Sequence, residues 1–365
     1  MRFRELVPSE TRIDFLRPWR LCAGLSVGLV LLSLAAALSP WRGVRLGIDF
    51  AGGTEVLVRF EPGIVADEGK LRPLVTACGA VEPTVIRYGE GESEFLLRFR
   101  RVASAETVES ALGRGDCPLT PADREALEAA ARAEGGEDPM GALVDRLAFA
   151  LRNAVGPLSV ERVEYVGPRV GEELRRDGLA AIGLGCLLIL VYVGFRFGPR
   201  YAPGAVVALV HDVSVTAGAF VLLGLEFDLQ VLAALLAVLG YSVNDTIIIY
   251  DRIRENVAIH TKQQLRDLIN QSVNQTLSRT VLTSGTTLLV VLCLLVLGGE
   301  VIRPFAIAMT IGILVGTYST VYIASPLLLW LEERAMRGRG GAQAAERAGG
   351  AEQGARKRSA PARRG

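Results

Sequence analysis

Charged and polar side chains interrupt the long apolar stretches of this sequence. His211 and Asp212 are adjacent in one stretch, Asn244 and Asp245 lie in the next, and Arg279 stands just ahead of a third. A carboxylate at membrane depth costs several kcal/mol unless it is paired, hydrated or protonated. Because intramembrane acids of this kind carry protons in pumps and transporters, the pattern favours a proton relay.

The positions of these residues along their stretches predict comparable depths. Asp212 lies ten residues into its stretch, about 15 Å deep, and Asp245 lies five residues before the end of its own, about 7–8 Å from the boundary. Arg279 lies at that same boundary and can reach inward along its stem. We therefore expect two carboxylates and one guanidinium to share one network, in which Asp245 changes charge when Arg279 moves or water enters.

Interpretations without proton transfer stay open. Asp245 and Arg279 could form a static ion pair that only fixes helix packing. Asp212 could be satisfied by His211 or by a water-filled entrance. The charges within Asp251–Glu255 stand where the helix leaves the lipid, and we interpret them as ordinary solvated charges.

The composition is that of an integral membrane protein. Hydrophobic residues make up 50% of the 365 residues, whereas charged residues make up only 22% and fall in blocks. Crossing a bilayer takes roughly 20 apolar residues in a helix. Six stretches reach about that length: Leu21–Leu38, Leu179–Phe195, Ala202–Leu225, Leu229–Tyr250, Thr280–Leu297 and Phe305–Trp330. The net charge of +1 gives no support to nucleic-acid binding.

Lysine and arginine gather at one end of the six predicted helices. They fill residues 1–20, the links after the second and fourth stretches, and the tail at 331–365. By the positive-inside rule both termini are cytoplasmic, and residues 41–177 lie on the far side of the membrane. Helix 21–38 is interpreted as an uncleaved anchor rather than a signal peptide, and the other five helices occupy 179–330. The basic tail is expected to be disordered.

Residues 41–177 are long enough for one small domain. Alternating patterns predict strands and amphipathic patterns predict helices, in the order βαββαβ of a ferredoxin-like α+β fold. The strands are Gly53–Phe60, Pro83–Tyr88, Phe95–Arg101 and Leu158–Val166, with a turn at Gly89–Gly91; the helices are one ending near Cys78, Ala105–Leu112 and Met140–Ala154. The stretch Gly113–Pro139 is interpreted as an insertion with a helix at Pro121–Ala133.

The expected domain contains no serine-histidine-acid grouping, so we expect a binding or mechanical role and no enzyme activity. The cysteines have no metal-binding spacing. Cys78 and Cys117 could form a disulfide in an oxidising compartment, but two unpaired thiols are the simpler interpretation. Gly47–Gly53 (GIDFAGG) precedes a strand and not a helix, so it is interpreted as a tight turn and not as a dinucleotide loop.

Small and hydroxyl residues recur within the apolar stretches. Gly24/Gly28 and Gly312/Gly316 have the spacing that allows helices to approach closely. The hydroxyl groups of Ser284–Thr287 could line a hydrated path.

Four motifs together resemble the SecF family of bacterial protein-export membrane subunits, within the SecD/SecF group of the resistance-nodulation-division superfamily. They are Gly47–Gly53, Val163–Leu174 (VEYVGPRVGEEL), Gly240–Asn256 (GYSVNDTIIIYDRIREN) and Ser278–Thr287 (SRTVLTSGTT), and the resemblance covers about residues 15–332.

The resemblance implies a subunit that works with SecD and the SecYEG channel and uses the proton-motive force to promote export of unfolded preproteins. YajC and SecA are further candidate partners, and protons are the only expected cofactor. Asp245, in its Asn244-Asp245 motif, matches the essential aspartate of the family, and Arg279 matches its functional arginine. Asp212 matches a His-Asp position. A small-molecule or lipid exporter of the same superfamily and a purely structural channel subunit are the alternatives.

Overall fold

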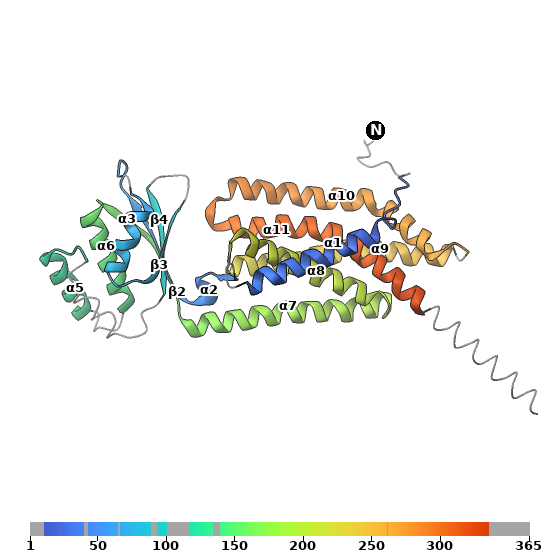
Figure 1. Ribbon diagram of the computed structural model, residues 1–365, viewed down its shortest axis with the longest axis horizontal. Coiled ribbons are helices and arrows are strands. Elements are labelled where there is room, and N and C mark those ends of the chain that lie inside the picture. Colours follow the sequence, from blue (N-terminus) through green and yellow to red (C-terminus); the bar gives the residue numbers. More distant parts are fainter. Residues whose placement is uncertain are drawn as a thin grey trace, which may run out of the picture.

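The computed structural model describes residues 11–39, 43–64, 66–88, 93–100, 117–133, 139–260 and 262–335. It has two parts that lie end to end, an elongated helical bundle and a smaller unit that contains a β-sheet (Figure 1). The first helix begins at the end of the bundle that lies away from the sheet.

Six helices are long and apolar enough to cross a membrane, as the sequence predicts. They are α1 (Trp19–Leu38), α7 (Pro168–Phe197), α8 (Ala202–Leu223), α9 (Leu229–Ile259), α10 (Leu265–Leu297) and α11 (Gly299–Ser319), which continues through the π-helix η1 (Thr320–Ala324). Several helices run past the apolar stretches: α7 begins at Pro168 and not at Leu179, because polar residues flanking an apolar run also propagate a helix. Hydropathy therefore locates the part of a helix in lipid and not its ends.

The centre of the bundle is formed by α8, α9 and the last span. In the most apolar window of α8, and likewise of the last span, 50% of the residues are buried, against 11% in α7. The chemistry-bearing residues of α8 and α9 therefore lie inside the bundle and not toward lipid.

Glycines of α11 allow it to approach α9. A Cβ on Gly312 would overlap the side chain of Val238, and a Cβ on Gly316 would come within 3.1 Å of a serine side chain of α9. The expected close packing at these two glycines is confirmed. The same expectation for Gly24 and Gly28 is wrong, because a Cβ there would meet nothing within 4 Å among the described residues.

The sheet unit has four antiparallel strands in the order β3-β4-β2-β5. The strands are β2 (Gly53–Phe60), β3 (Val81–Arg87), β4 (Glu94–Arg100) and β5 (Leu158–Val166); the helices are α3 (Glu68–Ala77), α5 (Pro121–Ala133) and α6 (Pro139–Ala154). Residues of β2, β4, α3 and α6 form one apolar core that includes Phe60, Phe95, Leu71 and Leu147. All four expected strands form, within a residue or two at their ends.

The helices expected before Cys78, at Met140–Ala154 and at Pro121–Ala133 also form. Helix α5 begins with reciprocal caps, because Thr120 Oγ1 accepts from the Asp123 N–H and Asp123 Oδ2 accepts from the Thr120 N–H. The hydrogen bonds from Thr120 and Asn153 hold the pKa of Asp123 below its ordinary value. The turn at Gly89–Gly91, the helix at Ala105–Leu112 and the tail beyond residue 335 lie outside the described residues.

Cys78 and Cys117 form a disulfide bond, so the interpretation of two unpaired thiols is wrong. Cys78 directly follows α3, and Cys117 precedes α5. Both side chains are buried in the apolar core of the sheet unit. Sequence spacing alone carried no sign that folding brings the two thiols together.

Replacing Gly312 by alanine should destabilise the bundle by about 1–3 kcal/mol, because the added methyl group overlaps Val238 in a packed contact. Gly28→Ala is the matched control, and it should not destabilise, since its methyl group meets open space and alanine favours helix. Equilibrium unfolding of the purified protein in detergent measures both changes. Equal stability of the two variants would contradict the close packing of α9 and α11.

Candidate functional site: the intramembrane carboxylates

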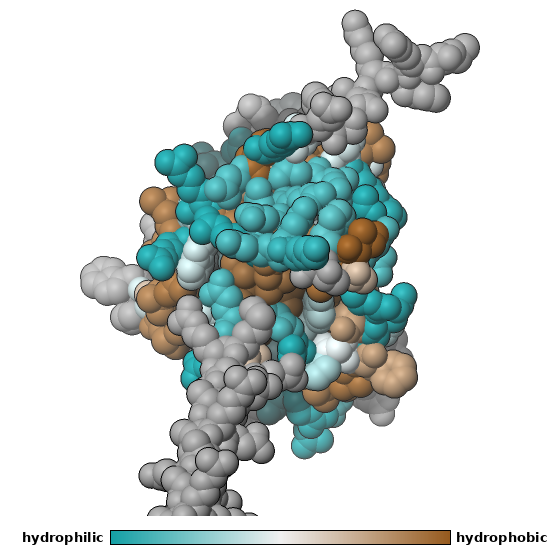
Figure 2. All heavy atoms as spheres, turned by 90° about the vertical axis from the view of Figure 1, so that its right-hand side faces the viewer, coloured by the Kyte–Doolittle hydropathy of each residue, from teal (hydrophilic) through white to brown (hydrophobic). Residues whose placement is uncertain are grey.

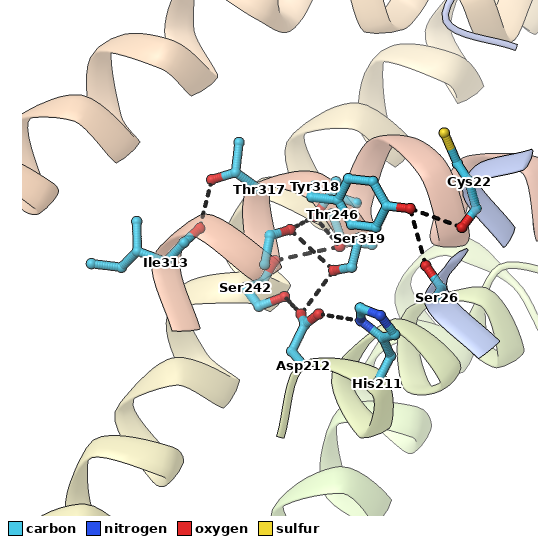
Figure 3. A network of polar contacts seen from close by, with 12 residues as sticks. Cys22, Ser26, His211, Asp212, Ser242, Thr246, Ile313, Thr317, Tyr318 and Ser319 are labelled. Atoms are coloured by element: carbon cyan, nitrogen blue, oxygen red, sulfur yellow. Dashed lines mark hydrogen bonds and ion pairs between the residues drawn. The ribbon is translucent and has the colours of Figure 1, made fainter. Parts of the chain in front are cut away.

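The side chain of Asp212, on α8, is fully buried, and both of its carboxylate oxygens have polar partners. Its Oδ1 lies 3.0 Å from His211 Nδ1, and its Oδ2 accepts hydrogen bonds from Ser242 Oγ of α9 at 2.5 Å and Ser319 Oγ of α11 at 2.8 Å. Figure 3 shows these groups converging on the carboxylate. Asp212 therefore ties three central helices together, and the expectation that His211 satisfies it is fulfilled only in part, because two hydroxyl groups contribute as well.

Asp245, on α9, is equally buried but has far fewer partners. Ser284 Oγ of α10 donates to its Oδ2 at 3.2 Å. Thr317 Oγ1 of α11 in turn donates a hydrogen bond to Ser284 Oγ at 3.0 Å. The other oxygen, Oδ1, has no hydrogen-bond partner within the described part of the chain. A buried polar atom without a partner marks a functional site or a place for water.

Arg279 is exposed on α10 and forms no ion pair with Asp245, both residues being described. It precedes Ser284 by five residues, about 7.5 Å along the helix axis. The direct pair considered from the sequence is thus absent from this conformation. Arg279 nevertheless lies on the helix that already contacts the carboxylate.

Asn244 does not join the network. Its side chain is exposed, whereas Asp245 beside it is buried, because adjacent helical residues point in different directions. Asp251 and Glu255 are exposed, and Glu255 pairs with Arg252 at 2.6 Å, which agrees with their interpretation as solvated charges.

The two carboxylates are linked through α9 and α11. Ser242, which bonds to Asp212, stands one turn before Asp245 on α9. On α11, Ser319 donates a hydrogen bond to Asp212, and Thr317 donates one to Ser284, whose hydroxyl group donates to Asp245. The hydrogen bonds nevertheless form two separate groups, one around Asp212 and one around Asp245, and Arg279 belongs to neither, so the single network expected from the sequence does not form among the described residues.

Sequence reasoning missed the polar segment Thr317–Thr320. Thr320 Oγ1 lies 3.1 Å from Thr246 Oγ1. The Tyr318 hydroxyl donates to the Cys22 carbonyl at 2.8 Å, which ties α1 to the centre (Figure 3). Four consecutive hydroxyl-bearing residues within an apolar stretch were the available sign. The expected hydroxyl path at Ser284–Thr287 holds only at Ser284, since the others bond to carbonyls of their own helix.

The π-helix η1 begins at Thr320, directly at this cluster. Ser325 Oγ donates to the Thr320 carbonyl at 3.0 Å, which helps satisfy the widened turn. Single π-turns inside α-helices are frequent at functional sites. The last span is therefore locally irregular at the level where it contacts the carboxylates.

A six-helix bundle with buried carboxylates at its centre and a sheet unit beyond one end defines a multi-pass membrane protein with an ionisable core. Comparison with known proteins gives the family. Residues 148–334 match the model of "Protein export membrane protein SecD/SecF, C-terminal", and residues 42–64 match the "SecD/SecF GG Motif".

Similar proteins carry the same assignment. Two are named protein translocase subunit SecF: that of Calditerrivibrio nitroreducens is 39% identical over 90% of this chain and 96% of the relative, and that of Pseudomonas aeruginosa is 38% identical over 84% and 89%. The crystal structure of SecDF, described as a translocon-associated membrane protein, from Thermus thermophilus has a TM-score of 0.68 at 35% identity, over 89% of this chain and 39% of that longer one.

The chain belongs to the SecD/SecF family. It is a multi-pass membrane subunit of the Sec protein-export system, as the recognised motifs predicted. The alternative of a small-molecule or lipid exporter gains no support from these relatives.

Replacing Ser319 by alanine should destabilise the protein by about 1.5–3 kcal/mol, because it removes a hydrogen bond to a buried charged group. Thr286→Ala is the control, since that hydroxyl is exposed and bonds only to its own helix. Thermal unfolding of the purified variants checks the difference. A Ser319 variant as stable as the Thr286 variant would show that Asp212 is not the tie between the helices.

Proposed function

We propose that this chain, together with SecD, uses the proton-motive force to promote translocation of secreted proteins through SecYEG. The observation that carries the proposal is the buried carboxylate of Asp245, which has one hydroxyl donor and one unpartnered oxygen among the described residues. A buried acid in this state responds to a proton, to an approaching cation or to water.

Asp245 is the proton-carrying group in this proposal, and Arg279 is its conditional partner. Helix α10 carries both Ser284, which donates to the Asp245 carboxylate, and Arg279, whose side chain is exposed. Arg279 lies about 7.5 Å from Ser284 along the helix axis, so a shift and rotation of α10 against α9, together with the reach of the arginine side chain, would exchange the hydroxyl for the guanidinium. Proton release would then accompany that shift, and proton uptake would reverse it.

Water would reach Asp245 from the side of Arg279. The buried hydroxyl of Thr280 lies between Arg279 and Ser284 in the sequence, and it also has no hydrogen-bond partner among the described residues. Thr280 stands one turn before Ser284 on the same face of α10, the face that contacts Asp245, so its unpartnered hydroxyl favours a place for water on this route. Asn244 lies outside this route.

Asp212 takes a different role in the proposal. Its three hydrogen-bonding partners leave little reason for its contacts to change. It would hold α8, α9 and α11 in register while α10 moves.

The sheet unit is proposed to be a periplasmic ferredoxin-like domain, with both termini cytoplasmic. The strand order β3-β4-β2-β5, with antiparallel neighbours, is the order that a βαββαβ chain gives. The Cys78–Cys117 disulfide favours an oxidising compartment. Figure 2 shows the end of the bundle that lies away from the sheet unit, and hydrophilic side chains gather over the middle of that end. The links between helices are rich in arginine there, which favours a cytoplasmic location for this end.

The partners proposed are SecD, the SecYEG channel, YajC and SecA, with an unfolded preprotein as cargo and membrane lipid as surroundings. The role is mechanical and not enzymatic, and protons are the only cofactor proposed.

Asp245→Asn should abolish the part of preprotein export that depends on the proton gradient, because an amide cannot exchange a proton. Asp251→Asn is the matched control and should export normally, since Asp251 is exposed beyond the buried layer. Export into inverted vesicles, measured with and without a proton gradient, separates this part from the ATP-driven part. Complex formation with SecD should be unchanged in both variants.

Full gradient-dependent export by Asp245→Asn would contradict the relay and favour a purely structural subunit. Loss of export in Asp251→Asn as well would show that any charge change in this region disturbs assembly.

The periplasmic assignment makes a second prediction. Cys78 and Cys117 should be oxidised in the protein isolated from cells, and should react with a thiol reagent only after reduction. Replacing both by alanine should cost about 2–4 kcal/mol of stability. Mass spectrometry of thiol-labelled peptides, with and without prior reduction, measures the redox state. Free thiols in the isolated protein would contradict the placement of the sheet unit in the periplasm.

A further inference from the structure

The motif Gly47–Gly53 is the joint between the sheet unit and the bundle. It forms the short helix α2 (Ile48–Ala51), preceded by β1 (Arg45–Leu46), which pairs with β6 (Glu226–Phe227) just ahead of α9. The expectation of a simple tight turn was therefore incomplete. The motif lies against the start of α9, the helix that carries Asp245.

Asp49 of α2 caps α9 from outside that helix. Its Oδ2 accepts the Leu229 N–H at 2.9 Å, while Asp228 accepts the Val231 N–H at 2.8 Å as the helix's own cap. A single carboxylate is enough to cap a helix. Burial raises the pKa of Asp228, opposed by backbone N–H groups of α9, and the negative charge of Asp49 adds to the rise. The second carboxylate therefore adds repulsion that a simple cap does not need.

The glycines of this region are required by close contact. A Cβ on Gly47 would come within 3.0 Å of the Phe227 carbonyl oxygen. A Cβ on Gly171, in the first turn of α7, would come within 3.1 Å of the Phe50 carbonyl oxygen. Helix α2 therefore lies against the starts of α7 and α9 with no room for a side chain at either of these two glycines.

The sheet itself provides a second contact. Arg98 of β4 forms ion pairs with Glu226 of β6 and with Glu55 of β2. The Glu226 pair is therefore the one that joins the sheet to the segment leading into α9. A cavity of about 330 Å³, lined by both charged and apolar side chains, adjoins these residues and Asp49, so the joint has room to rearrange.

We propose that Asp49 and the Arg98–Glu226 ion pair are the positioning residues that transmit movement between the intramembrane carboxylate and the sheet unit. Helix α9 supplies the connection, because Leu229 and Asp245 are sixteen residues apart on one helix, about 24 Å. The inference rests on the proton relay proposed above. Beyond that relay, it identifies the contacts through which a movement of the membrane helices reaches the sheet unit.

The test uses full-length protein in complex with SecD, and it compares Asp49→Ala combined with Glu226→Gln against Glu94→Gln. Glu94 pairs with Arg59 inside the sheet unit, so its variant removes a similar ion pair without touching the joint. The joint variant should fold and bind SecD but lose gradient-dependent export, whereas Glu94→Gln should retain it.

Hydrogen-exchange rates of the sheet unit distinguish transmission of movement from a purely structural role, because a purely structural contact would not make these rates depend on Asp245. With the joint intact, Asp245→Asn should change the exchange rates of β4 and α2. In the joint variant, the same Asp245→Asn change should leave those rates unaltered. If Asp49→Ala lowers the yield of folded protein, Glu226→Gln alone carries the test, because it leaves the helix cap in place.

Two different failures are distinguishable. The proposed role of the joint would be overturned if the joint variant kept gradient-dependent export. It would also be overturned if Asp245→Asn still changed hydrogen exchange of the sheet unit in the joint variant. Neither result would contradict the relay. Gradient-dependent export by Asp245→Asn itself would overturn the relay, and the joint inference with it.

Discussion

Carboxylates buried among apolar helices need hydrogen-bond donors, and the arrangement of the bundle depends on where those donors are. Asp212 receives them from its own helix and from α9 and α11, which fixes the three central helices. Asp245, one turn from Ser242, receives a single hydroxyl from α10. The first site is complete and the second is incomplete. This contrast separates a structural acid from the one proposed to exchange a proton.

The periodicity and charge of the sequence predicted the six spans, the four strands and the two carboxylates, because each depends on local composition. Of the partners of those carboxylates the sequence offered only His211 for Asp212, since Ser242, Ser319 and Ser284 come from separate helices and only packing brings them to the carboxylates. It also left the Cys78–Cys117 bond undecided, because that bond depends on the tertiary fold. The direct Asp245–Arg279 pair considered from the sequence is absent among the described residues, because Arg279 is exposed on α10, five residues before the Ser284 that contacts Asp245.

Among the described residues, the β1–β6 pairing, the Asp49 cap on α9 and the Arg98–Glu226 ion pair connect the sheet unit to the membrane bundle. Helix α2 reaches the start of α9, and strand β5 leads through Gly167 directly into α7. Movements of these helices therefore have a short path to the sheet. The family motif at residues 42–64 includes α2, so a family model covers the connection.

The central claim is that Asp245 gains and loses a proton as the protein works. Infrared difference spectroscopy of the reconstituted protein across a pH titration measures this directly through the carbonyl stretch of protonated carboxyl groups. The account predicts a titrating band that is lost in Asp245→Asn and retained in Asp251→Asn. A titration unchanged by Asp245→Asn would show that this carboxylate keeps one charge state, which would contradict the account.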